Sequence, residues 1–262
     1  MLMEVLLHNK NFIMMNNNFV LITGASSGIG KEIAIKLSEH YNILLHGRQM
    51  DKLMAVKEKC SNNSNQLIWQ QDLNEIDFIE SSLVNFLALN KISIIKYVHS
   101  AGHMKLVPLR MSTIEVLKTT FNINVIAASL ICKVLTQKKV NNTALDAIVF
   151  ISSNISNMGA KALSAYGASK GAVDSLMRCL AMELAPKVRL NSVLPGAVLT
   201  EMTEAIFLNE EVKRRMEITY PLGIGKPDDI FQAVNFLLSD NARWITGQQI
   251  TVDGGRTVNI TG

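Results

Sequence analysis

The stretch FVLITGASSGIG at residues 19–30 joins an apolar run to three closely spaced glycines. The apolar run predicts a buried strand, and the residues from Ile29 onward have helical spacing, so we expect a strand, a turn and a helix. Gly24 permits the tight turn, Gly28 lets the backbone approach a phosphate, and Gly30 lets the helix pack closely on the sheet. The free N–H groups of the helix would then face the pyrophosphate of a dinucleotide.

The alternation of strand and helix continues to the end of the chain. Apolar runs fall at 19–23, 42–46, 67–70, 94–99, 147–152, 188–193 and 249–252, and helical spacing falls at 29–39, 50–60, 77–89, 114–138, 165–184 and 228–239. This order predicts βαβ units, and nearly continuous apolar strands are typical of a sheet covered on both faces. We expect an α/β fold: a single doubly wound Rossmann-type domain at 18–262, with a mostly parallel seven-stranded sheet and helices on both faces. Residues 1–17 are interpreted as an N-terminal extension.

Composition narrows the classes of function. The chain has 262 residues, 48% of them hydrophobic, and a net charge of +4 with no long basic run, so we expect no nucleic-acid partner. Cys60, Cys132 and Cys179 are too far apart in sequence to suggest a zinc site or a disulfide framework. No apolar run reaches the roughly 18–20 residues of a membrane span. We therefore expect a cytoplasmic protein without a metal ion or a membrane partner.

The second predicted strand ends at HGRQ, residues 46–49. Chains that bind NAD usually carry an acid near this point, for the adenosine ribose. Here Gly47 stands at that position and Arg48 follows, a pair that would accept a 2′-phosphate where a carboxylate would repel it. The sequence thus favours NADP(H), with a solvated loop arginine as the alternative interpretation of Arg48. Asp72, after the third strand, could bind the adenine amino group or cap the next helix.

Tyr166 and Lys170, in SAYGASK at 164–170, lie on the same face of a predicted helix because they are four residues apart. A phenol with an ordinary pKa near 10 is a poor acid or base at neutral pH, and a neighbouring ammonium lowers that pKa. Lys170 would therefore make Tyr166 a usable acid/base. Ser153 lies thirteen residues upstream at the end of a predicted strand, where its hydroxyl could hold a carbonyl oxygen.

These motifs together resemble the short-chain dehydrogenase/reductase family over about residues 18–258, with NIN at 122–124, PG at 195–196 and the stretch 221–255 adding to the likeness. The resemblance implies that Tyr166 is the acid/base, that Lys170 binds the nicotinamide ribose, that Ser153 orients the carbonyl and that Asn124 holds a water of the proton relay. Val198 and Thr200 would lie near the nicotinamide amide. The residues expected to bind the cofactor are Gly24, Ser26, Ser27, Gly28, Ile29, Gly30, Arg48, Asp72, Leu73, Ala101, Gly102, Tyr166, Lys170, Pro195, Gly196, Val198 and Thr200.

One departure concerns the fourth strand, where the family usually has Asn-Asn-Ala-Gly and this chain has His99-Ser100-Ala101-Gly102. We interpret His99 as a structural residue rather than a base. The sequence as a whole resembles those of 3-oxoacyl-acyl-carrier-protein reductases. This resemblance implies a ketone reductase acting on a small molecule or an acyl thioester.

Two alternative functions stay open at this stage. One is a sugar, polyol or other secondary-alcohol dehydrogenase, and the other is a non-catalytic dinucleotide sensor. The role of Lys138, Lys139 and Lys187 is also open, because they could bind an acidic carrier protein or form a solvated face. We also expect a homodimer or homotetramer, because the two long helices are apolar on more than one face.

Overall fold

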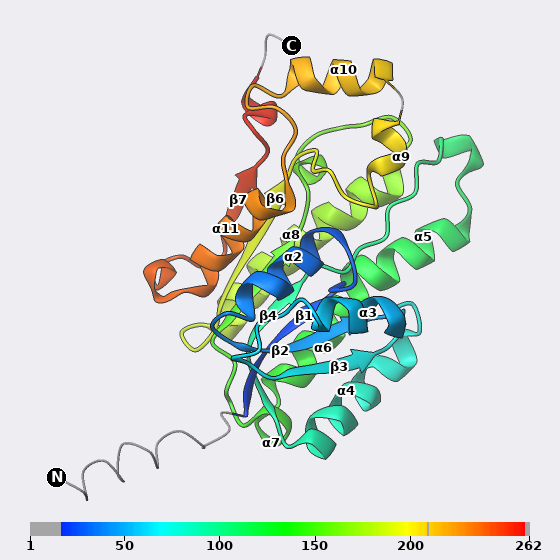
Figure 1. Cartoon of the computed structure of the whole chain (residues 1–262). Coiled ribbons are helices and arrows are strands. Elements are labelled where there is room, and N and C mark those ends of the chain that lie inside the picture. Colours follow the sequence, from blue (N-terminus) through cyan, green and yellow to red (C-terminus); the bar gives the residue numbers. More distant parts are fainter. Residues whose placement is uncertain (1–16, 209, 260–262) are drawn as a thin grey trace, which may run out of the picture.

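The computed structural model describes residues 17–208 and 210–259, and the predicted extension at 1–17 lies outside this part apart from Asn17. Seven parallel strands form one sheet in the order β3-β2-β1-β4-β5-β6-β7 (Figure 1). The strands are β1 (Asn18–Thr23), β2 (Asn42–Gly47), β3 (Gln66–Gln70), β4 (Ser93–His99), β5 (Ala147–Ile151), β6 (Arg189–Pro195) and β7 (Gln249–Val252). The predicted seven strands and their parallel pairing are confirmed.

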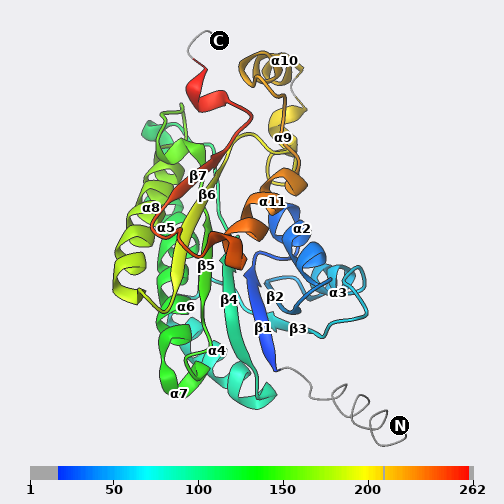
Figure 2. The ribbon, with the colours of Figure 1, turned by 90° about the vertical axis from the view of Figure 1, so that its left-hand side faces the viewer.

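Helices connect the strands and cover the sheet on both sides. They are α2 (Gly28–Leu37), α3 (Met50–Lys57), α4 (Ile76–Asn90), α5 (Ile114–Phe121), α6 (Ala127–Thr136), α7 (Lys138–Asn141), α8 (Ser164–Leu184), α9 (Glu204–Phe207), α10 (Glu210–Thr219) and α11 (Pro227–Leu238). Figure 2 shows α4, α5, α6 and α8 on one face, with α2, α3 and α11 on the other.

The strands β1 to β6 each contribute to two separate apolar cores because their side chains alternate between the faces. In β1, Phe19 and Leu21 belong to the core under α4, α6 and α8, whereas Val20 and Ile22 belong to the core under α2 and α11. All four side chains are buried. This double burial explains why the strand reads as a continuous apolar run rather than an alternating one.

The chain order of the sheet reverses between β1 and β4, which are neighbours although they are three strands apart in sequence. The loops that follow β1 and β4 turn to opposite faces of the sheet. Doubly wound sheets bind their ligands in the crevice between two such loops, at the carboxyl ends of the strands. The glycine loop after β1 and the segment after β4 meet here, so the fold itself brings the predicted motifs together.

The predicted helix at 114–138 is not continuous. A π-helical turn, η2 (Asn122–Ile126), separates α5 from α6, and α6 ends at Thr136. The stretch Ile114–Thr136 is long and apolar enough to cross a membrane by length and composition alone, although it contains no unbroken apolar run of that length. Its apolar residues include Ala128, Ile131 and Val134, which are fully buried against the sheet, so the composition is that of a core helix.

Candidate active site

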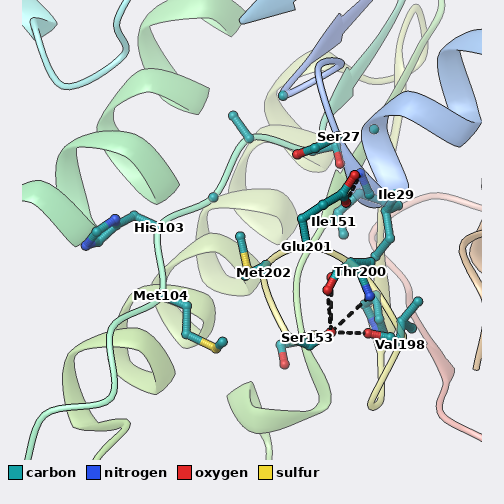
Figure 3. A pocket seen from close by; sticks show the side chains of 18 of the residues that line it. Ser27, Ile29, His103, Met104, Ile151, Ser153, Val198, Thr200, Glu201 and Met202 are labelled. Atoms are coloured by element: carbon teal, nitrogen blue, oxygen red, sulfur yellow. Dashed lines mark hydrogen bonds between the residues drawn. The ribbon is translucent and has the colours of Figure 1, made fainter. Parts of the chain in front are cut away.

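A cavity of about 350 Å³ opens at the carboxyl ends of the strands, beside the point where the strand order reverses. Every residue expected to bind the cofactor lines this cavity, and so does Ser153 (Figure 3). Segments from six different places in the sequence supply the lining: the loops after β1, β2, β3, β4, β5 and β6. One cavity thus holds the glycine loop together with Ser153, Tyr166 and Lys170.

Two glycines of the loop leave no room for a side chain. A Cβ atom on Gly24, whose φ is +67°, would lie 2.8 Å from the backbone of Ala101, and a Cβ on Gly30 would lie 2.3 Å from the Gly24 carbonyl oxygen. The turn therefore presses the start of α2 against the segment after β4. This contact is the close packing that the sequence predicted for Gly30.

The start of α2 already holds an anionic group. Gly28 N–H donates to Glu201 Oε2 at 2.9 Å, and Lys31 Nζ lies 3.5 Å from Glu201 Oε1. Partial burial opposes ionisation of Glu201, but hydrogen bonds from its own and the Gly28 backbone N–H, together with Lys31, hold its pKa below the ordinary value. Here the carboxylate stands in for a phosphate oxygen, so the residues present fit the pyrophosphate of a dinucleotide.

The opposite end of the cavity carries the residues expected at the adenosine. A Cβ on Gly47 would lie 3.2 Å from Leu53 and 3.4 Å from Ser26 Oγ, so an acid at this position would crowd its neighbours. Arg48 Nη1 lies 3.8 Å from Asp72 Oδ2, with the Arg48 side chain largely exposed and Asp72 partly exposed, which makes this ion pair weak. Asp72 accepts from Asn74 N–H in the turn before α4, so it does not cap that helix directly.

Three of the four predicted catalytic residues come from the loop after β5 and from α8. Ser153 follows β5, where its side chain accepts from Ile155 N–H at 3.2 Å. Tyr166 and Lys170 lie one turn apart on α8, with Lys170 Nζ 5.6 Å from the centre of the Tyr166 ring. Lys170 Nζ donates to the Ile151 carbonyl at 2.8 Å, which anchors the ammonium and leaves two of its hydrogens for other acceptors.

The acid–base balance differs from the sequence prediction in one respect. Burial raises the pKa of Tyr166 above 10, with the Ser153 side chain acting in the opposite direction, whereas Lys170 was expected to lower it. Burial also lowers the pKa of Lys170 to about 8, and Asp174, one turn further along α8, raises it in part. Burial is thus the largest effect on the pKa of Tyr166, and the phenol is in its protonated, proton-donating form at neutral pH.

Asn124 lies in η2, behind the cavity rather than in its lining. Its Oδ1 accepts from His103 N–H at 2.7 Å, and its Nδ2 donates to the His103 carbonyl and, at 2.8 Å, to Ser169 Oγ. Both amide hydrogens and one oxygen lone pair are used in this way. The side chain thus clamps the segment after β4 onto α8, and the predicted water-holding role stays a prediction.

The substitution of His99 for the usual asparagine is absorbed by a buried network. Its Nε2 donates to the Ile123 carbonyl at 3.2 Å, and Tyr97 O–H donates to its Nδ1 at 2.7 Å. Burial lowers the pKa of His99 to about 3, so the ring is neutral. The geometry agrees with a structural role, because His99 ties β4 to η2 next to Asn124.

Residues that the motifs did not predict line the side of the cavity beyond Ser153 and Tyr166. They are Met104, Ile155, Leu163, Met202, Phe207, Met216 and Tyr220. Four of them come from the region between Pro195 and Pro221, where the structure has α9 and α10. No local sequence pattern assigns such residues to a site.

A switch-point cavity with a glycine cradle for phosphates, and with serine, tyrosine and lysine beside it, defines a dinucleotide-dependent oxidoreductase. A family model described as enoyl-(acyl carrier protein) reductase matches residues 24–257. This chain belongs to the short-chain dehydrogenase/reductase family and is an NAD(P)-dependent oxidoreductase.

Characterised relatives span several substrates. The chain is 30% identical to a glucose 1-dehydrogenase of Gluconobacter oxydans, with 91% of each chain covered. It is 29% identical to the 3-oxoacyl-[acyl-carrier-protein] reductase FabG of Chlamydia trachomatis, covering 91% of this chain and 97% of that one. The solved structure of a 4-hydroxyisoleucine dehydrogenase complexed with NADH has a TM-score of 0.86 at 27% identity, covering 92% of this chain and 99% of that chain.

Proposed function

We propose that this protein reduces a ketone to a secondary alcohol, with NADPH preferred over NADH. The observation that carries the proposal is the common cavity, which holds the glycine cradle together with Ser153, Tyr166 and Lys170. When bound, the reduced nicotinamide supplies the hydride to the carbonyl carbon, and the carbon–oxygen π bond opens toward oxygen. The Tyr166 hydroxyl gives that oxygen its proton, and solvent returns a proton to the tyrosine.

The other side chains support this proton transfer. The Ser153 hydroxyl can donate to the carbonyl oxygen as negative charge develops on it. Lys170, anchored on the Ile151 carbonyl, has hydrogens left for the ribose hydroxyls of the cofactor, and its charge stabilises the phenolate that forms. The raised pKa of Tyr166 keeps the phenol protonated at neutral pH, which suits reduction.

The preference for NADPH rests on Gly47 and Arg48 at the adenosine end. We expect kcat/KM to be higher with NADPH than with NADH, measured by the absorbance of the reduced nicotinamide during ketone reduction. Arg48→Ala should lower the NADPH value by roughly 10- to 100-fold and leave the NADH value within about twofold, because a charge-assisted contact to the 2′-phosphate contributes on the order of 1.5–3 kcal/mol.

Arg178→Ala is the matched control, since Arg178 lies exposed on α8 and outside the cavity lining. It should change neither value. Equal efficiency with both cofactors, or a preference for NADH, would contradict the assignment of Arg48. A preference for NADH is a realistic outcome, because a similar solved structure is complexed with NADH.

The similarity to a glucose 1-dehydrogenase favours a second candidate, oxidation of a sugar. A panel of ketones, an acetoacetyl thioester and glucose, assayed in both directions, separates the candidates. An acidic carrier protein docked on Lys138, Lys139 or Lys187 is not favoured, because these lysines precede β5 and β6 and so lie at the opposite end of the sheet from the cavity (Figure 1).

A further inference from the structure

The side of the cavity that faces Ser153 and Tyr166 is built almost wholly from apolar side chains. Met104 follows β4, Ile155 and Leu163 flank the turn before α8, and Met202, Phe207 and Met216 come from the region of α9 and α10. Figure 3 shows Met104 and Met202 directed into the cavity on the side of Ser153, with the His103 ring turned away from it.

Backbone contacts fix two parts of this wall against each other. Val107 N–H donates to the Ala162 carbonyl at 2.8 Å, which holds the Met104 segment beside the Leu163 segment. The Asn124 clamp on His103 holds the same segment to α8. The Met104 and Leu163 parts of the apolar wall are therefore held together by the backbone in this structure.

The polar groups near this wall are mostly bound to the protein itself. Thr203 Oγ1 accepts from Thr200 N–H and donates to the Val198 carbonyl at 2.6 Å. Asn154 donates to Asp253, and Tyr220 Oη accepts from Ala197 N–H at 3.0 Å. Among the described residues on this side, the groups left for a substrate are few: the hydroxyls of Ser153, Tyr166 and Tyr220 and the amide oxygen of Asn154.

This inventory matches a substrate with one polar group. A ketone needs partners for one oxygen, and Ser153 and Tyr166 supply them. A sugar brings several hydroxyls more, and each one buried without a partner costs on the order of 1–3 kcal/mol. An apolar ring or chain instead gains about 25 cal/mol per Å² of surface removed from water. Methionines suit such a ligand because their unbranched side chains adapt to its shape.

We propose that the substrate of this site is an apolar ketone, cyclic or of medium chain length, and not a sugar or a polyhydroxylated ketone. The inference rests on the proposed function, because it assigns the ligand of the same Ser153 and Tyr166. It is independent of the cofactor preference, which concerns the other end of the cavity.

The decisive comparison uses two ketones with the same ring. Cyclohexanone and myo-inosose differ in that the second carries five ring hydroxyls. With saturating NADPH we expect kcat/KM to be at least about 100-fold higher for cyclohexanone, since apolar pockets discriminate against a single added hydroxyl by up to about this factor. Equal values, or a preference for myo-inosose, would overturn the inference and leave the oxidoreductase proposal standing.

Binding provides a readout that does not need turnover. Saturation-transfer NMR on the NADP⁺ complex should show that cyclohexanone binds. A roughly tenfold excess of myo-inosose should not displace it, because the unpaired hydroxyls of myo-inosose weaken its binding. If no carbonyl compound is reduced but cyclohexanone binds selectively, the proposed function fails and the pocket assignment holds. Binding of myo-inosose in preference to cyclohexanone would refute the pocket assignment whatever the activity.

A nearly isosteric pair of substitutions tests the wall itself. Met104→Gln places an amide in the cavity and should raise KM for cyclohexanone roughly tenfold, with kcat and NADPH affinity within about twofold. Met111→Gln is the control, because Met111 lies on the same segment, 63% exposed and outside the cavity lining. Identical KM values for the two variants would contradict a role for Met104 in binding an apolar substrate.

Discussion

The hydroxyl of Tyr166 is the group on which the proposed chemistry depends most. Tyr166→Phe removes one oxygen and keeps the ring, so the fold and the affinity for NADPH should be nearly unchanged. Ketone reduction should fall by about 10²–10⁴-fold, because no other positioned group gives the alkoxide its proton. Steady-state kinetics and a fluorescence titration of NADPH check the two halves of this expectation. Near-full activity in the variant would refute the mechanism.

Asp174 affects the same chemistry through Lys170. Its carboxylate is 1% exposed, and neither oxygen has a hydrogen-bond partner among the described residues. Its negative charge raises the pKa of Lys170, which burial lowers to about 8. If protonated Lys170 supports reduction, the rate falls as pH rises through about 8. Asp174→Asn removes the negative charge and lowers the pKa of Lys170 further, so this decline should move to lower pH.

The pH dependence of kcat/KM for ketone reduction measures this shift. Glu183→Gln is the control, since Glu183 is exposed near the end of the same helix. It should leave the profile in place. A profile that moves to higher pH in Asp174→Asn, or does not move, would show that Asp174 does not set the charge of Lys170.

At the residue scale, the sequence shows which residues lie together where the pattern is local, and their roles stay predictions. Gly24, Gly28 and Gly30, and the pair Tyr166 and Lys170, lie within single short motifs whose spacing dictates their shared location. The direction of the Tyr166 pKa was wrong, because burial depends on the whole fold and no four-residue spacing reports it. Glu201 was missed for a similar reason: no sequence signal joins a residue after β6 to the first helix.

At the scale of elements, Glu201 links the loop after β6 to the start of α2. Its carboxylate accepts from the Gly28 N–H that the fold presents to a pyrophosphate, so the two anions compete for one donor. Glu201→Gln keeps the shape and removes the charge. NADPH should bind roughly fivefold more tightly, because a hydrogen bond to a charged group is worth about 1 kcal/mol more than a neutral one.

A fluorescence titration of NADPH measures this affinity. Glu204→Gln is the matched control, because Glu204 is exposed at the start of the adjacent helix α9. Its affinity should equal that of the wild type. Weaker binding in Glu201→Gln would mean that the carboxylate contributes to the cofactor site instead of competing with it.

The elements themselves were predicted well and their interruptions poorly. Both ends of all seven strands lie within two residues of the predicted ranges. Strands buried on both faces are nearly continuous apolar runs, which are easy to find in a sequence. The π-helical turn at Asn122–Ile126 was not predicted, because such a short turn has no composition of its own that marks it. Helices α9 and α10 were not predicted, because α9 has only four residues and α10 is charged over most of its length.

At the scale of the molecule, the arrangement of the sheet followed from βαβ order alone, because right-handed crossovers leave few topologies. The oligomeric state does not follow in this way. Helix α8 buries Val173, Met177 and Ala181 against the sheet, while Ala172 and Leu176 on its other side are half-buried. Small and apolar residues left at the surface of a long helix favour contact with another helix.

We therefore expect the protein to self-associate as a dimer or tetramer through this outer face of α8. Sedimentation velocity at micromolar concentration should show a species at two or four times 28.9 kDa. Ala172→Glu places a charge on the outer face without touching the core, so it should shift the equilibrium toward the monomer. Asn62→Glu adds the same charge at an exposed turn and should leave the assembly intact. A wild-type monomer would contradict self-association, and an unchanged oligomer in Ala172→Glu would place the contact on another face.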